Sequence, residues 1–367
     1  MRTLLAPTCA CLLTLGCGGG ATSQPTASSA ATDPAATNAN EAEAVPTPAP
    51  PPPSTAASTF EVHEWGFVDV PQSGATELGA GPGQPSTDMP MTVRKPVVYM
   101  HADPGTTTPP LDVVARFPSG ELLEVWPTRS EWPSTQSDVS SIHWTGLAIG
   151  PCDASASALA TTQREARGCA TLDGYCEVND LPTYVTTDAS CLAANGVSAP
   201  LLFYRGRTST ATLPLRVTDD GATVHLESSA LGGSSVLHVR DGVGSETAWP
   251  ANGTSVTTPA QRTLDGAALA TRLSSMLVAA GLTQPEADAF LRAWSSPLFG
   301  VPWPASQAGT RDEPARRGPA RGLAPLPAPY VLYILPEASV PALAELTITP
   351  APRVVRRVMV VRVELTR

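Results

Sequence analysis

Short runs of alternating apolar and polar residues recur along this chain from residue 60 to its end. In the run 222–228, for example, Val224 and Leu226 fall on one face and polar residues fall on the other. This period of two is typical of strands whose sheet has one face on a core and the other in water. The predicted strands are 60–70, 96–101, 111–117, 121–126, 142–149, 201–205, 212–217, 222–228, 235–240, 330–335 and 354–365.

Two helices interrupt the strand pattern. Between residues 269 and 280, apolar residues recur at spacings of three and four, which predicts one helix that ends before Gly281. Thr283 and Glu286 have the spacing of a capping box at the start of a second helix, and we expect Pro297 to end it. The chain is therefore predicted to be mainly β, with antiparallel, sandwich-like sheets and one α-helical hairpin near its C-terminal third.

Composition and charge exclude several classes of protein. The 367 residues include 29 Gly and 39 Pro, which favours short strands and loops over a helical bundle. The net charge is −10 and Lys95 is the sole lysine, so no nucleic-acid partner is predicted, because such partners require a basic surface. The sequence has no phosphate-binding loop or serine nucleophile elbow, and no cofactor is predicted.

The N-terminus has the pattern of a bacterial export signal. Residues 1–16 combine Arg2 with an apolar stretch, and Leu15-Gly16-Cys17 resembles the lipobox of lipoproteins, in which the cysteine receives the lipid. Thr14 stands where a leucine is usual, and a plain secretory signal that is cut elsewhere is the alternative. We predict a signal peptide over 1–16 and lipidation of Cys17.

The segment that follows is predicted to be a disordered tether over 17–59. Ala, Pro, Thr and Ser make up 32 of the 42 residues from 18 to 59, a composition that cannot bury a core. We therefore expect an exported protein with a lipid anchor. Its predicted location is the bacterial outer membrane, the cell surface or the periplasm. The folded part comprises a β-rich domain, 60–255, and the helical hairpin with the C-terminal strands, 256–367, packing on the same body.

Four cysteines lie within 40 residues of one another, in a predicted insertion over 151–198. Their spacings lack the close pairs typical of zinc sites, so we predict two disulfides that staple a loop. Three connectivities are open, and we favour the one with two local loops. The cysteines, in the favoured pairs, are Cys152–Cys169 and Cys176–Cys191.

Candidate chemistry is concentrated in the segment Val62-His63-Glu64-Trp65-Gly66. In a regular strand His63 and Glu64 face opposite ways, so a catalytic pair would need a bulge at Gly66. His101 and His143 lie at the ends of other predicted strands, and a metal site of His63, His101 and His143 would require those ends to meet. The alternative is that the aromatic residues belong to the core and His63 bonds to a neighbour.

Four tryptophans precede prolines at predicted strand ends. Exposed rings there could stack on sugars and bind a glycan, whereas buried rings would close the end of a sandwich core. The four residues are Trp126, Trp132, Trp249 and Trp303.

Several short motifs occur in the order found in a group of uncharacterised bacterial exported proteins. The chain resembles the myxobacterial and planctomycete proteins that carry a Val-His-Glu-Trp-Gly-Thr-Phe signature, although Phe67 stands where their threonine would be. The resemblance implies an exported protein of unknown function and supplies no catalytic residue. The motifs are residues 60–66, 96–101, 202–206, 285–287, 330–333, 357–360 and 362–364.

Charged residues within the apolar strands suggest a structural ion pair. Glu64 lies in the first strand, and Arg357 and Arg362 lie in the last one. Because a buried charge must be paired, we expect Glu64 to contact one of these arginines, which would make the two strands neighbours.

The function favoured by the sequence is binding or structural work at the cell envelope, with an envelope protein or glycan as partner. The alternative is a hydrolase, either metal-dependent or using His63 and Glu64 as an acid–base pair. An enzyme should show these side chains together in a cleft, whereas a binding protein should show a paired, buried Glu64 and exposed aromatic rings.

Overall fold

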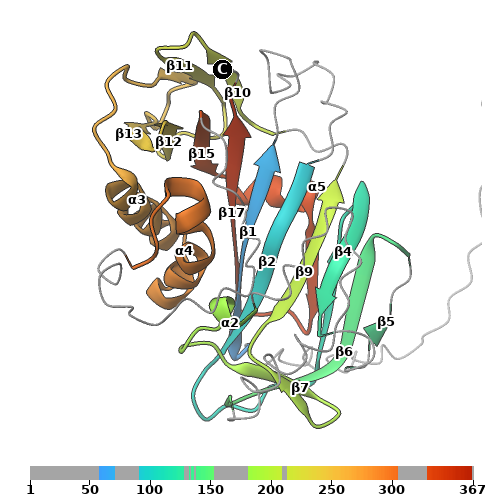
Figure 1. The fold of residues 1–367 in the computed structure, drawn as a ribbon. Coiled ribbons are helices and arrows are strands. Elements are labelled where there is room, and N and C mark those ends of the chain that lie inside the picture. The colour runs from blue at the N-terminus through green and yellow to red at the C-terminus, as the bar shows by residue number, and fades with distance from the viewer. Residues whose placement is uncertain are drawn as a thin grey trace, which may run out of the picture. The chain divides into compact units, whose positions relative to one another are not determined.

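The first and last strands of the folded chain lie side by side at the centre of a large sheet. In the computed structural model, residues 58–70, 91–127, 132, 134–135, 138–152, 181–208, 213–304 and 329–365 are described. The eight-stranded sheet has the order β13-β12-β15-β17-β1-β2-β9-β4 (Figure 1). Strand β1 pairs with β17 in parallel and with β2 in antiparallel orientation.

The described residues from 58 to 365 belong to one compact unit, and both predicted parts of it contribute strands to the large sheet. Its strands are β1 (Phe60–Val70), β2 (Met91–Ala102), β4 (Gly120–Trp126), β9 (Leu202–Thr208), β12 (Ser235–Arg240), β13 (Val243–Ala248), β15 (Tyr330–Ile334) and β17 (Val354–Glu364).

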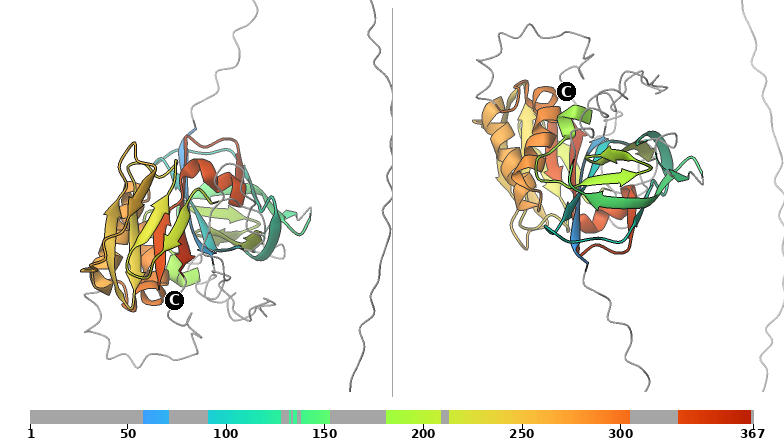
Figure 2. Two further views of the ribbon diagram at one scale, coloured as in Figure 1. Left: turned by 90° about the horizontal axis from the view of Figure 1, so that it is seen from above. Right: turned by 90° about the horizontal axis from the view of Figure 1, so that it is seen from below.

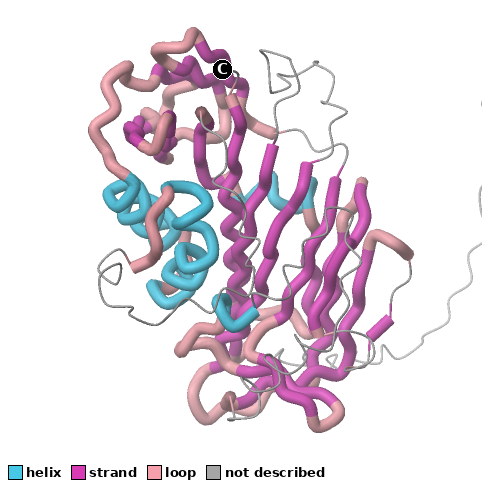
Figure 3. The backbone as a smooth tube through the Cα atoms, in the orientation of Figure 1, coloured by secondary structure: helices cyan, strands magenta, loops and turns pink. Residues whose placement is uncertain are grey.

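Two smaller sheets complete the β structure, as the tube in Figure 3 shows. A sheet of order β16-β3-β6-β7-β8 comprises β16 (Glu345–Thr349), β3 (Leu111–Arg116), β6 (Ser141–Gly150), β7 (Cys191–Ala194) and β8 (Val197–Ala199), and β5 (Ser134–Thr135) pairs with β6. A three-stranded sheet comprises β10 (Arg216–Asp219), β11 (Val224–Glu227) and β14 (Ser255–Thr257). The predicted mainly β, sandwich-like fold with a helical hairpin is confirmed.

The helical hairpin covers one face of the large sheet (Figure 2). It comprises α3 (Gly266–Ala279) and α4 (Gln284–Phe299), and the short helices are α2 (Leu181–Tyr184), η3 (Glu337–Ser339) and α5 (Val340–Leu343). Trp65 packs edge-on against Phe290 with ring centroids 5.3 Å apart, and Phe67 stacks on Trp294 at 4.0 Å. None of the helices in the described ranges is both long and apolar enough to span a membrane.

The capping pattern gave the start of α4 correctly, but its predicted end is wrong. Both hydrogen bonds of the capping box between Thr283 and Glu286 are present. Pro297 lies inside the helix, which continues to Phe299 and ends at Gly300 with φ +71°. Proline bars the residue before it from ideal helical geometry, yet Gly300 with its left-handed conformation is the residue that ends the helix.

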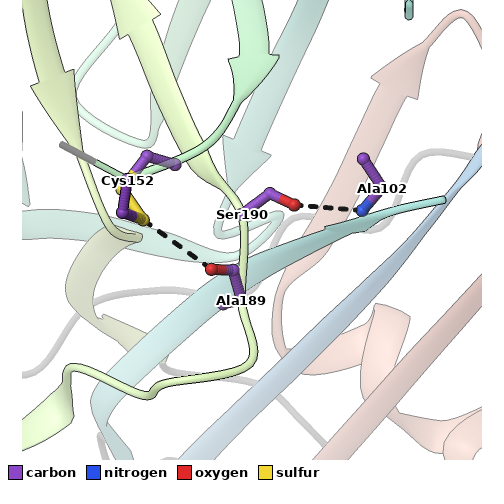
Figure 4. The surroundings of a disulfide bond; sticks show 5 residues. Ala102, Cys152, Ala189 and Ser190 are labelled. Atoms are coloured by element: carbon purple, nitrogen blue, oxygen red, sulfur yellow. Dashed lines mark hydrogen bonds between the residues drawn. A yellow bond between two sulfur atoms is a disulfide. The ribbon is translucent and has the colours of Figure 1, made fainter. Parts of the chain in front are cut away.

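The disulfide connectivity expected from local loop closure is wrong. Cys152 bonds to Cys191, with Cα atoms 4.8 Å apart (Figure 4). Strands β6 and β7 pair in antiparallel orientation, with Gly150 opposite Cys191, so sheet pairing brings the two cysteines together across 39 residues. Cys169 and Cys176 lie outside the described residues, as do Cys17, the signal 1–16 and the tether up to residue 57.

Gly206 permits a close approach of β9 to its neighbours. A Cβ atom there would lie 2.5 Å from the carbonyl oxygen of Glu121 and would overlap the Phe117 ring. We expect Gly206→Ala to lower the free energy of unfolding by about 3 kcal/mol, because backbone and ring must both shift. Gly150→Ala is the control, since a Cβ there meets nothing within 4 Å. Equal denaturation midpoints for the two variants would contradict this account.

His238 should make the fold sensitive to mild acid. Burial, followed by the charges of Arg262 and Arg240, lowers the pKa of His238 from 6.5 to about 4. The unfolded chain therefore binds a proton that the folded chain does not, and stability falls as the pH drops from 6.5 to 4. The shift corresponds to a loss of about 3 kcal/mol at most.

Chemical denaturation at pH 7 and pH 4 tests this prediction. The loss of stability between the two pH values should be smaller in His238→Gln than in the unmodified chain. His225→Gln is the control, because His225 lies on β11 with its side chain 45% exposed. A loss in His238→Gln as large as in the unmodified chain would refute the assignment.

Candidate metal centre

Three side chains from three separate elements converge at one edge of the interface between the large sheet and α4. His63 lies on β1, His101 near the end of β2, and Glu286 in the first turn of α4. His63 Nδ1 is 2.9 Å from one carboxylate oxygen of Glu286 and 3.1 Å from the other. His101 Nε2 is 2.8 Å from Glu286 Oε1. The nitrogen and oxygen atoms of the cluster lie within 4.8 Å of one another.

Strand register places both imidazoles on the same face. In the pairing of β1 with β2, Glu61 is opposite His101 and His63 is opposite Tyr99. Directly opposite residues share a face, as do alternate residues of one strand, so His63 and His101 both face α4. Their ring centroids are 4.5 Å apart.

The capping box of α4 holds the carboxylate in position. Thr283 donates its backbone N–H to Glu286 Oε2 at 2.8 Å, and Glu286 donates its own N–H to Thr283 Oγ1 at 3.3 Å. The side chain of Glu286 is fully buried. The Glu286 carboxylate therefore caps the helix and also contacts the two histidines. Its Oε2 atom is held in place by the backbone N–H of Thr283.

Electrostatics keep this carboxylate ionised. Burial alone would raise the pKa of Glu286, but hydrogen bonds from His101 and His63 outweigh it and lower the pKa to about 2. Burial likewise works to lower the pKa of His101, whereas its hydrogen bond to Glu286 prevails and raises that pKa. A negative charge at Glu286 is thus matched by a preference for positive charge at His101.

The second nitrogen of each histidine meets another oxygen. His101 Nδ1 is 3.2 Å from the carbonyl oxygen of Asp188, which can only accept, so Nδ1 carries a hydrogen. In a neutral ring the lone pair of Nε2 then faces the lone pairs of Glu286 Oε1. Such a contact requires either a proton on Nε2 or a cation between the two groups. His63 Nε2 lies 3.8 Å from Glu61 Oε2.

An arginine holds Glu61 at the rim of the cluster. Arg353 donates from Nη2 to Glu61 Oε1 at 2.7 Å and from Nη1 to Asp103 Oδ2 at 2.8 Å. The hydrogen bond from Arg353 lowers the pKa of Glu61 below its ordinary value. Glu61 therefore presents a charged carboxylate to the outer nitrogen of His63.

The donor set fits a transition-metal ion. Two imidazole nitrogens and one carboxylate oxygen are a ligand set used for zinc, with bonds of about 2.0–2.2 Å and ligand atoms about 3.3 Å apart in tetrahedral geometry. The nitrogen–oxygen separations of 2.8–3.1 Å differ from that spacing by a few tenths of an ångström, and the three ligand atoms all lie within 4.8 Å of one another. Asp188 and Glu61 would act on the outer nitrogens, the arrangement that orients metal-bound histidines.

Glu64 does not join this cluster, so the predicted His63–Glu64 catalytic pair is wrong. The register of β1 with β17 is continuous at His63 and Glu64. The bulge between Trp65 and Phe67 lies after Glu64 in the strand, so it does not bring Glu64 to the face of His63. Glu64 is fully buried on the opposite face, where Tyr204 and Arg357 donate hydrogen bonds to its carboxylate.

The charged residues of the last strand have separate partners. Of the two arginines predicted as partners of Glu64, Arg357 pairs with it and also donates to the carbonyl oxygen of Ala344 at 2.9 Å. Arg362 instead donates to Asp69 at 2.6 Å. Both carboxylates come from β1 and both arginines from β17, in register with each other.

His143 is not a third ligand. It lies on β6 in the six-stranded sheet, where its Nε2 is 4.0 Å from Asp112 Oδ2. The predicted three-histidine site is therefore wrong in its third member, and Glu286 takes that place. The sequence contained a signal for Glu286 in the capping box, but a capping glutamate predicts only a helix start.

The tryptophans that precede prolines do not form an exposed stacking surface. Trp126, Trp132 and Trp249 are buried, and Trp303 is partly buried against the core, with its Nε1 donating to Asp288 at 3.0 Å. Stacking on a sugar needs an open ring face, so the proposed glycan-binding role of these residues is wrong. Their rings pack at the edges of the core, as expected from the alternative interpretation in which these tryptophans close the end of a sandwich core.

A cavity of about 420 Å³ lies elsewhere, between the end of β15 and the last turn of α3. Its walls include Leu231, Met276, Leu335 and Val358, and no member of the cluster lines it. The cluster is therefore separate from this cavity.

Comparison with known proteins assigns no family. No family model matches the chain, and no curated protein matches it. The Fcho1 Mu homology domain of Danio rerio with bound Eps15 peptide is similar at a TM-score of 0.31 and 10% identity, over 83% of this chain and 94% of that one. A similarity at this level assigns neither a fold family nor a function, so a functional assignment depends on the geometry described above.

Proposed function

We propose that this is an exported, lipid-anchored envelope protein whose folded body binds one divalent transition-metal ion through His63, His101 and Glu286. The convergence of two imidazoles and a buried carboxylate from β1, β2 and α4 carries the metal assignment. The lipobox-like segment at Cys17 and the following Ala/Pro-rich tether support the envelope assignment. The resemblance to exported proteins with the Val-His-Glu-Trp-Gly signature agrees with it.

Two states account for the short contact between His101 Nε2 and Glu286, a bound metal ion and a protonated His101 ring. With Nδ1 donating to Asp188, the neutral ring has only a lone pair to direct at Glu286. A divalent cation would accept that lone pair together with those of the carboxylate and of His63. The competing explanation is an imidazolium at His101 that pairs with Glu286 and has a purely structural role.

Three protein ligands leave a coordination position for a water molecule or a group from a partner. Structural zinc sites usually have four protein ligands, whereas sites with three keep an open position. With Glu64 on the opposite face, the acid–base partner predicted for a hydrolase is absent from this position. We therefore propose metal binding in an envelope role rather than hydrolysis by the His63–Glu64 pair.

Titration of the metal-free, full-length chain tests the metal site. We expect the unmodified chain to bind one equivalent of Zn²⁺ by calorimetry. Glu286→Gln should bind Zn²⁺ at least about 100-fold more weakly, because the variant loses an anionic ligand. Glutamine keeps the capping-box geometry, so helix α4 should remain formed. His143→Gln, outside the cluster, should bind as tightly as the unmodified chain.

Two outcomes would overturn the proposal. If the unmodified chain binds no Zn²⁺, Co²⁺ or Ni²⁺ and Glu286→Gln only lowers the melting temperature, the cluster is a structural ion pair. If His143→Gln weakens binding as much as Glu286→Gln does, the metal binds at another place.

A further inference from the structure

The disulfide lies three residues from the carbonyl group that orients His101. Asp188 provides the acceptor for His101 Nδ1, and Cys191 is bonded to Cys152. Between them, Ala189 and Ser190 run alongside the end of β2 (Figure 4). The Cys152 sulfur is 3.7 Å from the carbonyl oxygen of Ala189.

Ser190 fastens this segment to the two neighbours of His101. Its N–H donates to the carbonyl oxygen of Met100 at 2.7 Å, and its Oγ accepts from the N–H of Ala102 at 3.2 Å. Met100 and Ser190 form an isolated antiparallel bridge. His101 is therefore held on both sides by Ser190, and its ring is held by the carbonyl of Asp188.

The C-terminal end of this segment continues directly into strand β7, which pairs with β6 and β8. Strand β7 begins at Cys191 and pairs with β6 over three residue pairs, of which Gly150 opposite Cys191 is the last. The disulfide joins Cys191, the first residue of β7, to Cys152, which lies two residues after the end of β6. Upstream of the segment, Arg292 of α4 donates to the carbonyl oxygens of Thr183 and Val185 at 3.2 and 3.0 Å.

We propose that the Cys152–Cys191 disulfide positions His101 for metal binding, so that opening it lowers the metal affinity of the site. This inference rests on the proposed metal-binding function. An external dithiol would open the bond by supplying two electrons and two protons. The products are thiols at Cys152 and Cys191 and the disulfide of the dithiol. Cys152, Cys191 and Ser190 are positioning residues, because none of them supplies a ligand atom. They act on His101 through Asp188 and through its chain neighbours Met100 and Ala102.

A double-mutant cycle on the full-length chain tests the proposal under non-reducing conditions. Co²⁺ is the probe, because its visible absorption reports both affinity and the number of nitrogen ligands. We expect the double variant Cys152→Ser/Cys191→Ser to bind Co²⁺ about 10- to 100-fold more weakly, the effect typical of losing a group that orients a ligand. In a His101→Ala background the same two changes should have no further effect, because the residue they position is gone.

A milder variant covers the case in which the double variant fails to fold. Ser190→Ala leaves the disulfide intact and removes only the hydroxyl that accepts from Ala102. We expect a several-fold loss of Co²⁺ affinity with an unchanged melting temperature. Ser234→Ala is the matched control, because the Ser234 hydroxyl donates to Leu231 in a turn remote in sequence from the cluster.

Each outcome decides one of the two proposals. Unchanged Co²⁺ affinity in both the double variant and Ser190→Ala would overturn the positioning role and leave the metal site standing. Equal losses with and without His101 would mean that the disulfide acts through general destabilisation, which also overturns it. If the unmodified chain does not bind Co²⁺ at all, the metal-binding proposal itself fails, and the positioning role falls with it.

Discussion

The parallel pairing of β1 with β17 is the constraint on which the rest of the structure depends. It joins residues 61–70 to residues 354–363 at the centre of the large sheet, almost 300 positions apart in the chain. Two ion pairs match this register, Glu64 with Arg357 and Asp69 with Arg362. A slip by one residue would turn every side chain of β1 to the other face and leave these charges buried without partners.

The two faces of β1 carry different polar chemistry for that reason. On one face, Glu64 is closed off by Tyr204 and Arg357, and burial together with the Glu64 charge raises the pKa of Tyr204 well above its usual value. On the other face, His63 meets the histidine of β2 and the capping glutamate of α4. Side chains next to each other in sequence thus serve a structural pair and a candidate metal centre. The alternation of the strand separates the two roles.

Local patterns predicted elements well where the local physics decides them. The first strand has the bounds 60–70 that its run of strand-forming residues predicts, and the capping box marks the start of α4. Among the described strands, β5, β7, β8, β13, β14 and β16 were not predicted. Each is short, and pairing with neighbouring strands contributes most of its stability. The disulfide was mispredicted for a related reason. Local loop closure favours near cysteines, whereas the pairing of β6 with β7 brings distant ones together.

By itself, the sequence determined the mainly β fold, the helical hairpin, the opposite orientations of His63 and Glu64, and the need for a charged partner of Glu64. These features follow from the periodicity of short stretches of sequence and from the free-energy cost of burying an unpaired charge. Only the tertiary structure decided that His101 and Glu286 meet His63, that His143 does not, and that the tryptophans are buried. Such contacts depend on strand order and helix docking, which are set by packing among segments far apart in the chain.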